Sequence, residues 1–170
     1  EAKFPCIIVN RGGNREFGAW NDVTIMRFFG QVASWGYVVV GSQYRGNAGG
    51  EGKEEFGGID VNDVLNLIPL LSNVAKADTS RMGMYGWSRG GMMTYLALTK
   101  TDKMKAAVVG SGMSDALKLA KARPEMDSVF AQLIPGYKLN RDSVLKTRSA
   151  SYWPEKISKT TPLLLFTGSS

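Results

Sequence analysis

The sequence contains no histidine and only one cysteine, Cys6, in 170 residues. Without a histidine, these residues cannot build a Ser-His-Asp catalytic triad on their own. A single cysteine cannot form an internal disulfide. No apolar run approaches the roughly 18 residues that a membrane-spanning helix needs, which excludes such a helix, and we expect no membrane partner. The 44% hydrophobic and 21% charged residues are typical of a globular domain and exclude a disordered chain.

Basic residues are in modest excess: 21 Lys and Arg stand against 15 Asp and Glu, a net charge of +6. These cations are scattered, with no run of four and no nucleic-acid-binding motif, so we expect no nucleic-acid partner. The first residues, Glu1–Cys6, show neither an initiating Met nor a signal peptide. We therefore expect the 170 residues to be the interior of a longer chain.

Short apolar runs rich in β-branched residues alternate with helical patterns. The spacing predicts strands at 4–9, 37–41, 82–85, 105–110 and 162–167, and helices at 20–35, from Asp60 onward and at 88–100. Residues 113–158 are helical in composition but irregular. Strands that alternate with helices at this spacing imply right-handed crossovers and a mostly parallel sheet. A three-layer α/β domain follows.

The segment Gly86-Trp87-Ser88-Arg89-Gly90 fits the pattern G-x-S-x-G. It lies directly between a predicted strand and a predicted helix, the context in which this pattern holds a nucleophilic serine on a sharp turn. Ser88 is therefore the candidate nucleophile. At the first turn of the following helix, the backbone N–H of Arg89 is free to stabilise an oxyanion.

A second glycine-containing loop, Asn10–Asn14, follows the first predicted strand. In hydrolases with the G-x-S-x-G turn, the loop at this place supplies the second oxyanion donor. Glycine lets the loop backbone approach a substrate closely. We expect Arg11 and Gly12 to contribute to the oxyanion hole with Arg89, although a plain glycine turn is the alternative.

The chain resembles the catalytic domain of the prolyl oligopeptidase family of serine peptidases. The similarity is spread over most of its length, in an ordered set of segments: 36–40 with Tyr44-Arg45-Gly46-Asn47, 57–64, 78–83 through 88–91, and Arg148-Ser149-Ala150 with 155–157 and 161–165. One departure is at Arg11-Gly12-Gly13-Asn14, where the family usually has His-Gly-Gly-Pro or a Tyr-containing loop. The Tyr hydroxyl that some members use as an oxyanion donor has no counterpart here.

The resemblance implies an α/β-hydrolase sandwich that residues 1–170 contain only in part, with the sheet incomplete at both ends. It implies cleavage of peptides or small esters through an acyl-enzyme on Ser88, with no metal or organic cofactor. The family's acid and histidine follow the last predicted strand, beyond Ser170.

Several other polar residues have two interpretations. Tyr44 and Arg45 either line a substrate site or brace their loop. Asp115 stands where some lipases place the acid, but without a histidine to orient we interpret it as a surface or capping residue. Asp60, at the start of a predicted helix, is interpreted as an N-cap.

The missing histidine leaves more than one function open. The 170 residues are either an inactive part of an active hydrolase or a catalytically dead relative that acts as a binding module. Within the enzymes, a carboxylesterase of the same fold is the alternative to a peptidase. We favour the part of an active hydrolase, because a free sheet edge as apolar as 162–167 is rare in proteins.

Overall fold

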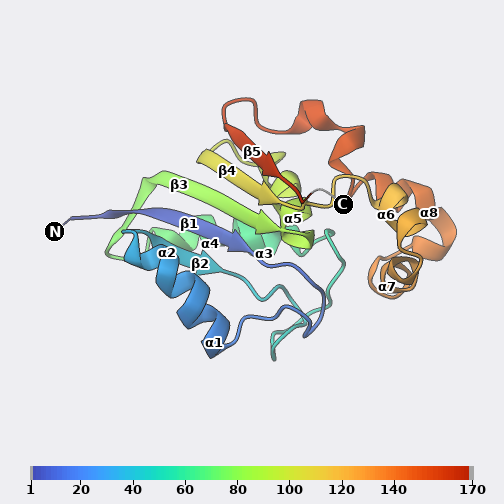
Figure 1. Ribbon diagram of the computed structural model, residues 1–170, viewed down its shortest axis with the longest axis horizontal. Coiled ribbons are helices and arrows are strands. Elements are labelled where there is room, and N and C mark those ends of the chain that lie inside the picture. Colours follow the sequence, from blue (N-terminus) through green and yellow to red (C-terminus); the bar gives the residue numbers. More distant parts are fainter. Residues whose placement is uncertain (1, 169–170) are drawn as a thin grey trace.

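A five-stranded parallel sheet organises the computed structural model, which describes residues 2–168 (Figure 1). Its strands are β1 (Phe4–Asn10), β2 (Val38–Gly41), β3 (Ala77–Trp87), β4 (Met104–Gly110) and β5 (Leu163–Phe166). They lie in the order β2-β1-β3-β4-β5, and every neighbouring pair is parallel. The predicted parallel sheet is confirmed, with β3 at its centre.

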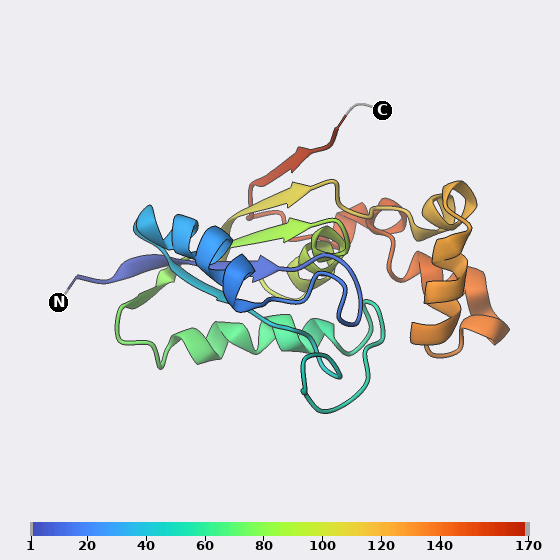
Figure 2. The ribbon, with the colours of Figure 1, turned by 60° about the horizontal axis from the view of Figure 1, so that its bottom comes forward.

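Helices lie on both faces of this sheet, which gives the predicted three layers (Figure 2). One face carries α1 (Asp22–Thr24), a π-helical turn η1 (Ile25–Phe29) and α2 (Gly30–Ser34), which together form the helix predicted for 20–35. The other face carries α3 (Val61–Leu65), α4 (Leu67–Leu71) and α5 (Arg89–Leu98). Within residues 2–168, no helix is long and apolar enough to cross a membrane.

The irregular segment predicted for 113–158 folds into short helices beyond the carboxyl ends of the strands (Figures 1 and 2). They are α6 (Ala116–Ala122), α7 (Glu125–Leu133) and α8 (Tyr137–Lys146), followed by 3₁₀ turns η2 (Ala150–Tyr152) and η3 (Pro154–Lys156). Loops at the carboxyl ends of parallel strands are the usual place for a ligand site in such sheets. The segment is therefore placed to form one wall of a site.

Helix α5 is the most deeply buried element. Each of its ten residues is buried, and a helix that is covered all round needs a sequence that is mostly small or apolar all round. Met92, Met93 and Leu98 fill the core between this helix and the sheet. This packing fixes the position of Ser88, the residue that precedes α5.

Pro69 predicts a kink in the helix after Asp60, and the structure interrupts that helix at Asn66, because Pro69 has no N–H to bond the carbonyl of Leu65 and its ring crowds that carbonyl. One local prediction needs correction. The run Val38–Val40 predicts a strand covered on both faces, but it is only half-buried, because within residues 2–168 β2 is the last strand on its side of the sheet. On the other side, the last described strand, β5, has exposed apolar side chains.

Candidate active site

Ser88 lies on a sharp turn between the central strand β3 and α5. Its backbone has φ 54° and ψ −120°. Residues other than glycine rarely adopt such angles, and those that do are often found at functional sites. The Ser88 N–H donates to the carbonyl of Gly110 at 2.9 Å, and its carbonyl accepts from the N–H of Gly91 at 2.9 Å. The predicted strand–turn–helix arrangement is confirmed, and the Ser88 side chain is exposed at its tip.

The turn requires glycine because β3, β1 and α5 approach one another closely. A Cβ added to Gly86 would lie 2.2 Å from the carbonyl oxygen of Gly90. A Cβ on Gly90 would lie 1.9 Å from the carbonyl oxygen of Asn10. Both distances are far shorter than any van der Waals contact, so a larger residue would push α5 away from the strands.

The loop after β1 packs directly against Ser88. A Cβ on Gly12 would lie 3.1 Å from the carbonyl oxygen of Trp87 and 3.4 Å from the Cβ of Ser88. On the other side of Ser88, Arg89 is the first residue of α5, so its N–H has no carbonyl one turn earlier in the helix to bond. The structure thus brings the Gly12 backbone and the Arg89 N–H to the same serine.

The side chain of Arg11 points away from this serine and is buried. Its guanidinium donates to the carbonyls of Gln43 at 2.9 Å, Arg15 at 2.9 Å and Phe17 at 3.1 Å. Burial, together with the nearby Arg89 cation, lowers the pKa of Arg11. Arg11 therefore braces the loop through its side chain, and only its backbone remains for an oxyanion.

The side chain of Arg89 is also buried, below the turn. It forms ion pairs with Glu54 and with Asp60, the latter at 2.7 Å. Asp60 stands at the N-cap position of α3, as predicted, but its side chain does not cap the helix: its carboxylate accepts from Arg89 and from the N–H of Gly57 at 2.9 Å. The carboxylate turns inward because the buried guanidinium requires a counter-charge.

Tyr44 and Arg45 occupy bracing positions in the structure. The buried Tyr44 hydroxyl donates to the carbonyl of Arg11 at 3.1 Å, and burial raises the pKa of this phenol. Arg45 forms an ion pair with Asp63 at 2.8 Å. Among the described residues, neither side chain lines the cavity beside Ser88, so the geometry favours the bracing alternative for both.

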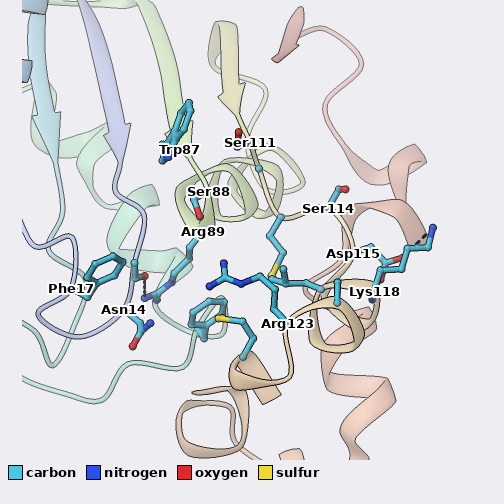
Figure 3. Close-up of a pocket in the computed structure, with 17 residues that line it drawn as sticks. Asn14, Phe17, Trp87, Ser88, Arg89, Ser111, Ser114, Asp115, Lys118 and Arg123 are labelled. Carbon is cyan, nitrogen blue, oxygen red and sulfur yellow. Dashed lines mark hydrogen bonds and ion pairs between the residues drawn. The ribbon is translucent and has the colours of Figure 1, made fainter. Parts of the chain in front are cut away.

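A cavity of about 620 Å³ opens beside Ser88, between the turn and the α6–α7 segment (Figure 3). Apolar side chains make much of its wall, and polar groups lie around them. The apolar contributors are Phe17, Phe56, Trp87, Met113, Leu119, Ala122 and Met126. Lys118 and Arg123 also line the cavity, and the guanidinium of Arg123 extends into it (Figure 3).

Hydrogen bonds to the first turn of α6 hold this helix in place at the cavity wall. Asp115 accepts from the N–H of Lys118 at 3.0 Å, so its predicted capping role is confirmed. The Ala116 N–H donates to the hydroxyl of Ser149 at 2.8 Å, which joins this turn to the segment after α8. Sequence reasoning missed this wall, because residues 113–158 have no simple period and their contacts are distant in sequence.

Comparison with known proteins agrees with this geometry. Residues 25–170 match the sequence model of the prolyl oligopeptidase family. The chain belongs to this family of serine peptidases. The uncharacterized peptidase YtmA of Bacillus subtilis strain 168 is 33% identical over 127 residues, which are 74% of this chain and 48% of YtmA. Human dipeptidyl peptidase 8 is 33% identical over 119 residues, 64% of this chain and 13% of that protein.

Solved structures share the α/β-hydrolase fold. A puromycin-hydrolyzing peptidase of Mycobacterium tuberculosis superposes with a TM-score of 0.79 at 25% identity, over 99% of this chain and 26% of that chain. The acylaminoacyl peptidase of Pyrococcus horikoshii superposes with a TM-score of 0.75 at 27% identity, over 98% of this chain and 27% of that chain. The chain thus spans about half the length of YtmA and a smaller share of the other three proteins.

Proposed function

We propose that this chain carries the nucleophile of a serine hydrolase that cleaves peptides or small esters through an acyl-enzyme on Ser88. The proposal rests chiefly on the strained backbone of Ser88, which projects the hydroxyl at the mouth of a cavity. A serine that merely starts a helix has no need of a left-handed φ. The match to a peptidase family supports the same chemistry.

In the proposed reaction, the Ser88 Oγ attacks the substrate carbonyl carbon and its proton passes to a base. The C–N or C–O bond then breaks, and the amine or alcohol leaves with that proton. The acyl group now sits on Ser88 Oγ. The same base then takes a proton from water, and the water oxygen bonds to the acyl carbon. The bond from that carbon to Oγ breaks, the proton passes to Oγ, and the acid product leaves. The Arg89 N–H and the Arg11–Gly12 backbone stabilise the oxyanion that forms before each bond breaks.

We propose that residues outside these 170 supply the base and the acid, so that 1–170 form part of a catalytic domain. No histidine is present in the sequence to take the serine proton. Asp115 is engaged as a helix cap, with Lys118 beside it. The chain also spans only about half of YtmA.

The cavity wall supports a substrate with an apolar group on its acyl side. Met113, Leu119 and Met126 offer a polarizable surface that adapts to different apolar shapes. The extended guanidinium of Arg123 suits a substrate carbonyl or carboxylate at the rim. We propose a peptide or N-acyl peptide over a small acetyl ester for this reason.

Hydrolysis by four proteins tests the proposal: the 170-residue chain and a chain extended through an Asp and a His, each with and without Ser88→Ala. We expect Ser88-dependent turnover only in the extended chain, because losing the base costs on the order of 10⁶ in turnover. Ser88-dependent turnover in the short chain would contradict the missing base. Its absence in a folded extended chain would favour a binding module, and turnover of esters but not peptides would favour a carboxylesterase.

A further inference from the structure

The side chain of Arg89 takes part in more contacts than its place after the nucleophile requires. It is 3% exposed, and its guanidinium carbon lies 4.5 Å from the ring centre of Phe56 and 4.9 Å from that of Tyr44. These distances are within the range of cation–π attraction. The guanidinium thus contacts two aromatic rings beneath the Ser88 turn.

Hydrogen bonds also hold this guanidinium. Nη1 donates to Glu54 and, at 3.1 Å, to the carbonyl of Gly13, and Nη2 donates to Asp60 at 2.7 Å. Glu54 also accepts from the N–H of Arg15 at 2.8 Å. The two carboxylates and one cation are nearly inaccessible to water, so their mutual geometry is stiff.

This cluster controls both sides of Gly12. The carbonyl after it, that of Gly13, accepts from Arg89. The carbonyl before it, that of Arg11, accepts from the Tyr44 hydroxyl, and Tyr44 stacks under the same guanidinium. The segment that approaches Ser88 is therefore anchored at both neighbouring residues, through one buried cation and the ring beneath it.

A buried ion pair alone would be weak evidence of function, because apolar residues of similar volume often stabilise a core equally well. Here the cation also bonds the loop that faces the nucleophile. An apolar side chain could fill the same space but could not bond the Gly13 carbonyl. A Lys could carry the charge but could not reach two carboxylates and that carbonyl in one plane.

We propose that the Arg89 side chain is a positioning residue, which sets the Gly12 backbone at the distance from Ser88 that the oxyanion needs. This inference rests on the proposed function and extends the expectation that Arg89 acts through its N–H. Arg89 then ties the two halves of the oxyanion hole together: its N–H belongs to one half and its guanidinium holds the other.

Three variants of the extended chain test this role. Arg89→Met removes the cation but leaves two buried carboxylates without a counter-charge, so we expect it to lose stability as well as activity. The triple variant Arg89→Met, Glu54→Gln, Asp60→Asn removes that charge problem and still lacks the bond to Gly13. Arg89→Lys keeps one positive charge. Arg81→Met with Asp78→Asn, an ion pair near the start of β3 and away from the cavity, is the matched control.

For the triple variant we expect a melting temperature near that of the wild type. Its kcat for an activated ester should fall at least about tenfold while KM changes little, because misplacement of a catalytic group raises the energy of the transition state. Amide hydrogens at 12–14 should exchange faster. The control should keep kcat within about twofold. A triple variant with wild-type kcat and wild-type exchange would overturn the proposal, since the cluster would then serve stability only.

Arg89→Lys decides the matter if the triple variant does not fold: wild-type kcat in folded Arg89→Lys would overturn the positioning role, and a lowered kcat at unchanged KM would support it. If the wild-type extended chain shows no Ser88-dependent hydrolysis, the proposed function fails separately. Amide exchange at 12–14 then still tests the anchoring, because unchanged exchange in Arg89→Lys would refute it without any measurement of turnover.

Discussion

Gly12 lies against Ser88 so closely that a Cβ on the glycine would be 3.4 Å from the Cβ of the serine and 3.1 Å from the carbonyl oxygen of Trp87. Because the backbone of Gly12 does not have a positive φ, it is this crowding alone that disfavours a side chain here. Gly12→Val should therefore push the loop away from Ser88. We expect kcat of the extended chain for an activated ester to fall about 100-fold or more, the cost of losing an oxyanion donor.

Gly30→Val is the control for this change. Gly30 lies in α2, where an added Cβ would meet only the carbonyl oxygen of Ile25, at 3.9 Å. The control should lose a little helix stability and keep kcat within about threefold. Equal losses of kcat in the two variants would show that the loop at Gly12 has no special place in catalysis.

Met126 tests the apolar wall of the cavity. Its side chain lines the cavity beside Ser88, and Met126→Trp would fill part of the 620 Å³. We expect kcat/KM for a long acyl ester to fall about tenfold relative to that for an acetyl ester, a typical effect of one blocked apolar subsite. Met26→Trp, on the exposed π-helical turn, should leave the ratio unchanged. An unchanged ratio in Met126→Trp would place the acyl group elsewhere.

Ser149 holds the first turn of α6 in place. Its buried hydroxyl accepts from the Ala116 N–H at 2.8 Å and donates to the Leu145 carbonyl at 2.7 Å. Ser149→Ala leaves a buried N–H without a partner, so we expect the free energy of unfolding to fall by about 1–3 kcal/mol in urea titrations. The exposed Ser143→Ala should change it by less than about 0.5 kcal/mol. Similar effects of both changes would contradict the role of the Ser149 hydroxyl.

The sequence predicted the geometry of the Ser88 turn better than that of its surroundings. Ser88 and its glycines could be found because they are contiguous and their spacing is dictated by a strand that meets a helix. The sequence did not reveal that Arg89 forms ion pairs with Glu54 and Asp60. These partners lie about 30 positions away along the chain, and such a pairing leaves no periodic pattern. Asp60 in particular is a residue type that often caps helices, and only the structure shows that its carboxylate pairs with the buried guanidinium of Arg89.

The contribution of Asp127 to the stability of the α7–α8 segment depends on pH. Its carboxylate accepts from the hydroxyl of Tyr137 at 2.5 Å and from Nη2 of Arg141 at 2.6 Å. These bonds, that of Tyr137 first, lower the pKa of Asp127 below its ordinary 3.8, while burial and the same carboxylate raise the pKa of Tyr137 to about 12. The stabilisation is therefore complete above about pH 4 and is lost as the pH falls through the lowered value.

The test compares urea midpoints of wild type and Asp127→Asn from pH 7 down to pH 2. We expect Asp127→Asn to be the less stable at pH 7 and the difference to shrink below pH 4. Asp142→Asn, a more exposed carboxylate beside the same Arg141, should show a smaller difference at pH 7. A gap for Asp127→Asn that stays constant down to pH 2 would refute the proposed linkage.

The apolar edge strand β5 has a consequence for the behaviour of the 170-residue chain in solution. Leu164, Leu165 and Phe166 are 61%, 57% and 45% exposed, and within residues 2–168 the strand order ends at β5. A strand at the edge of a sheet exposes unpaired backbone groups, and here it also exposes apolar side chains. The sheets of two copies can therefore pair edge to edge. At high concentration the chain should therefore grow into intermolecular β-structure, and it should remain monomeric only when dilute.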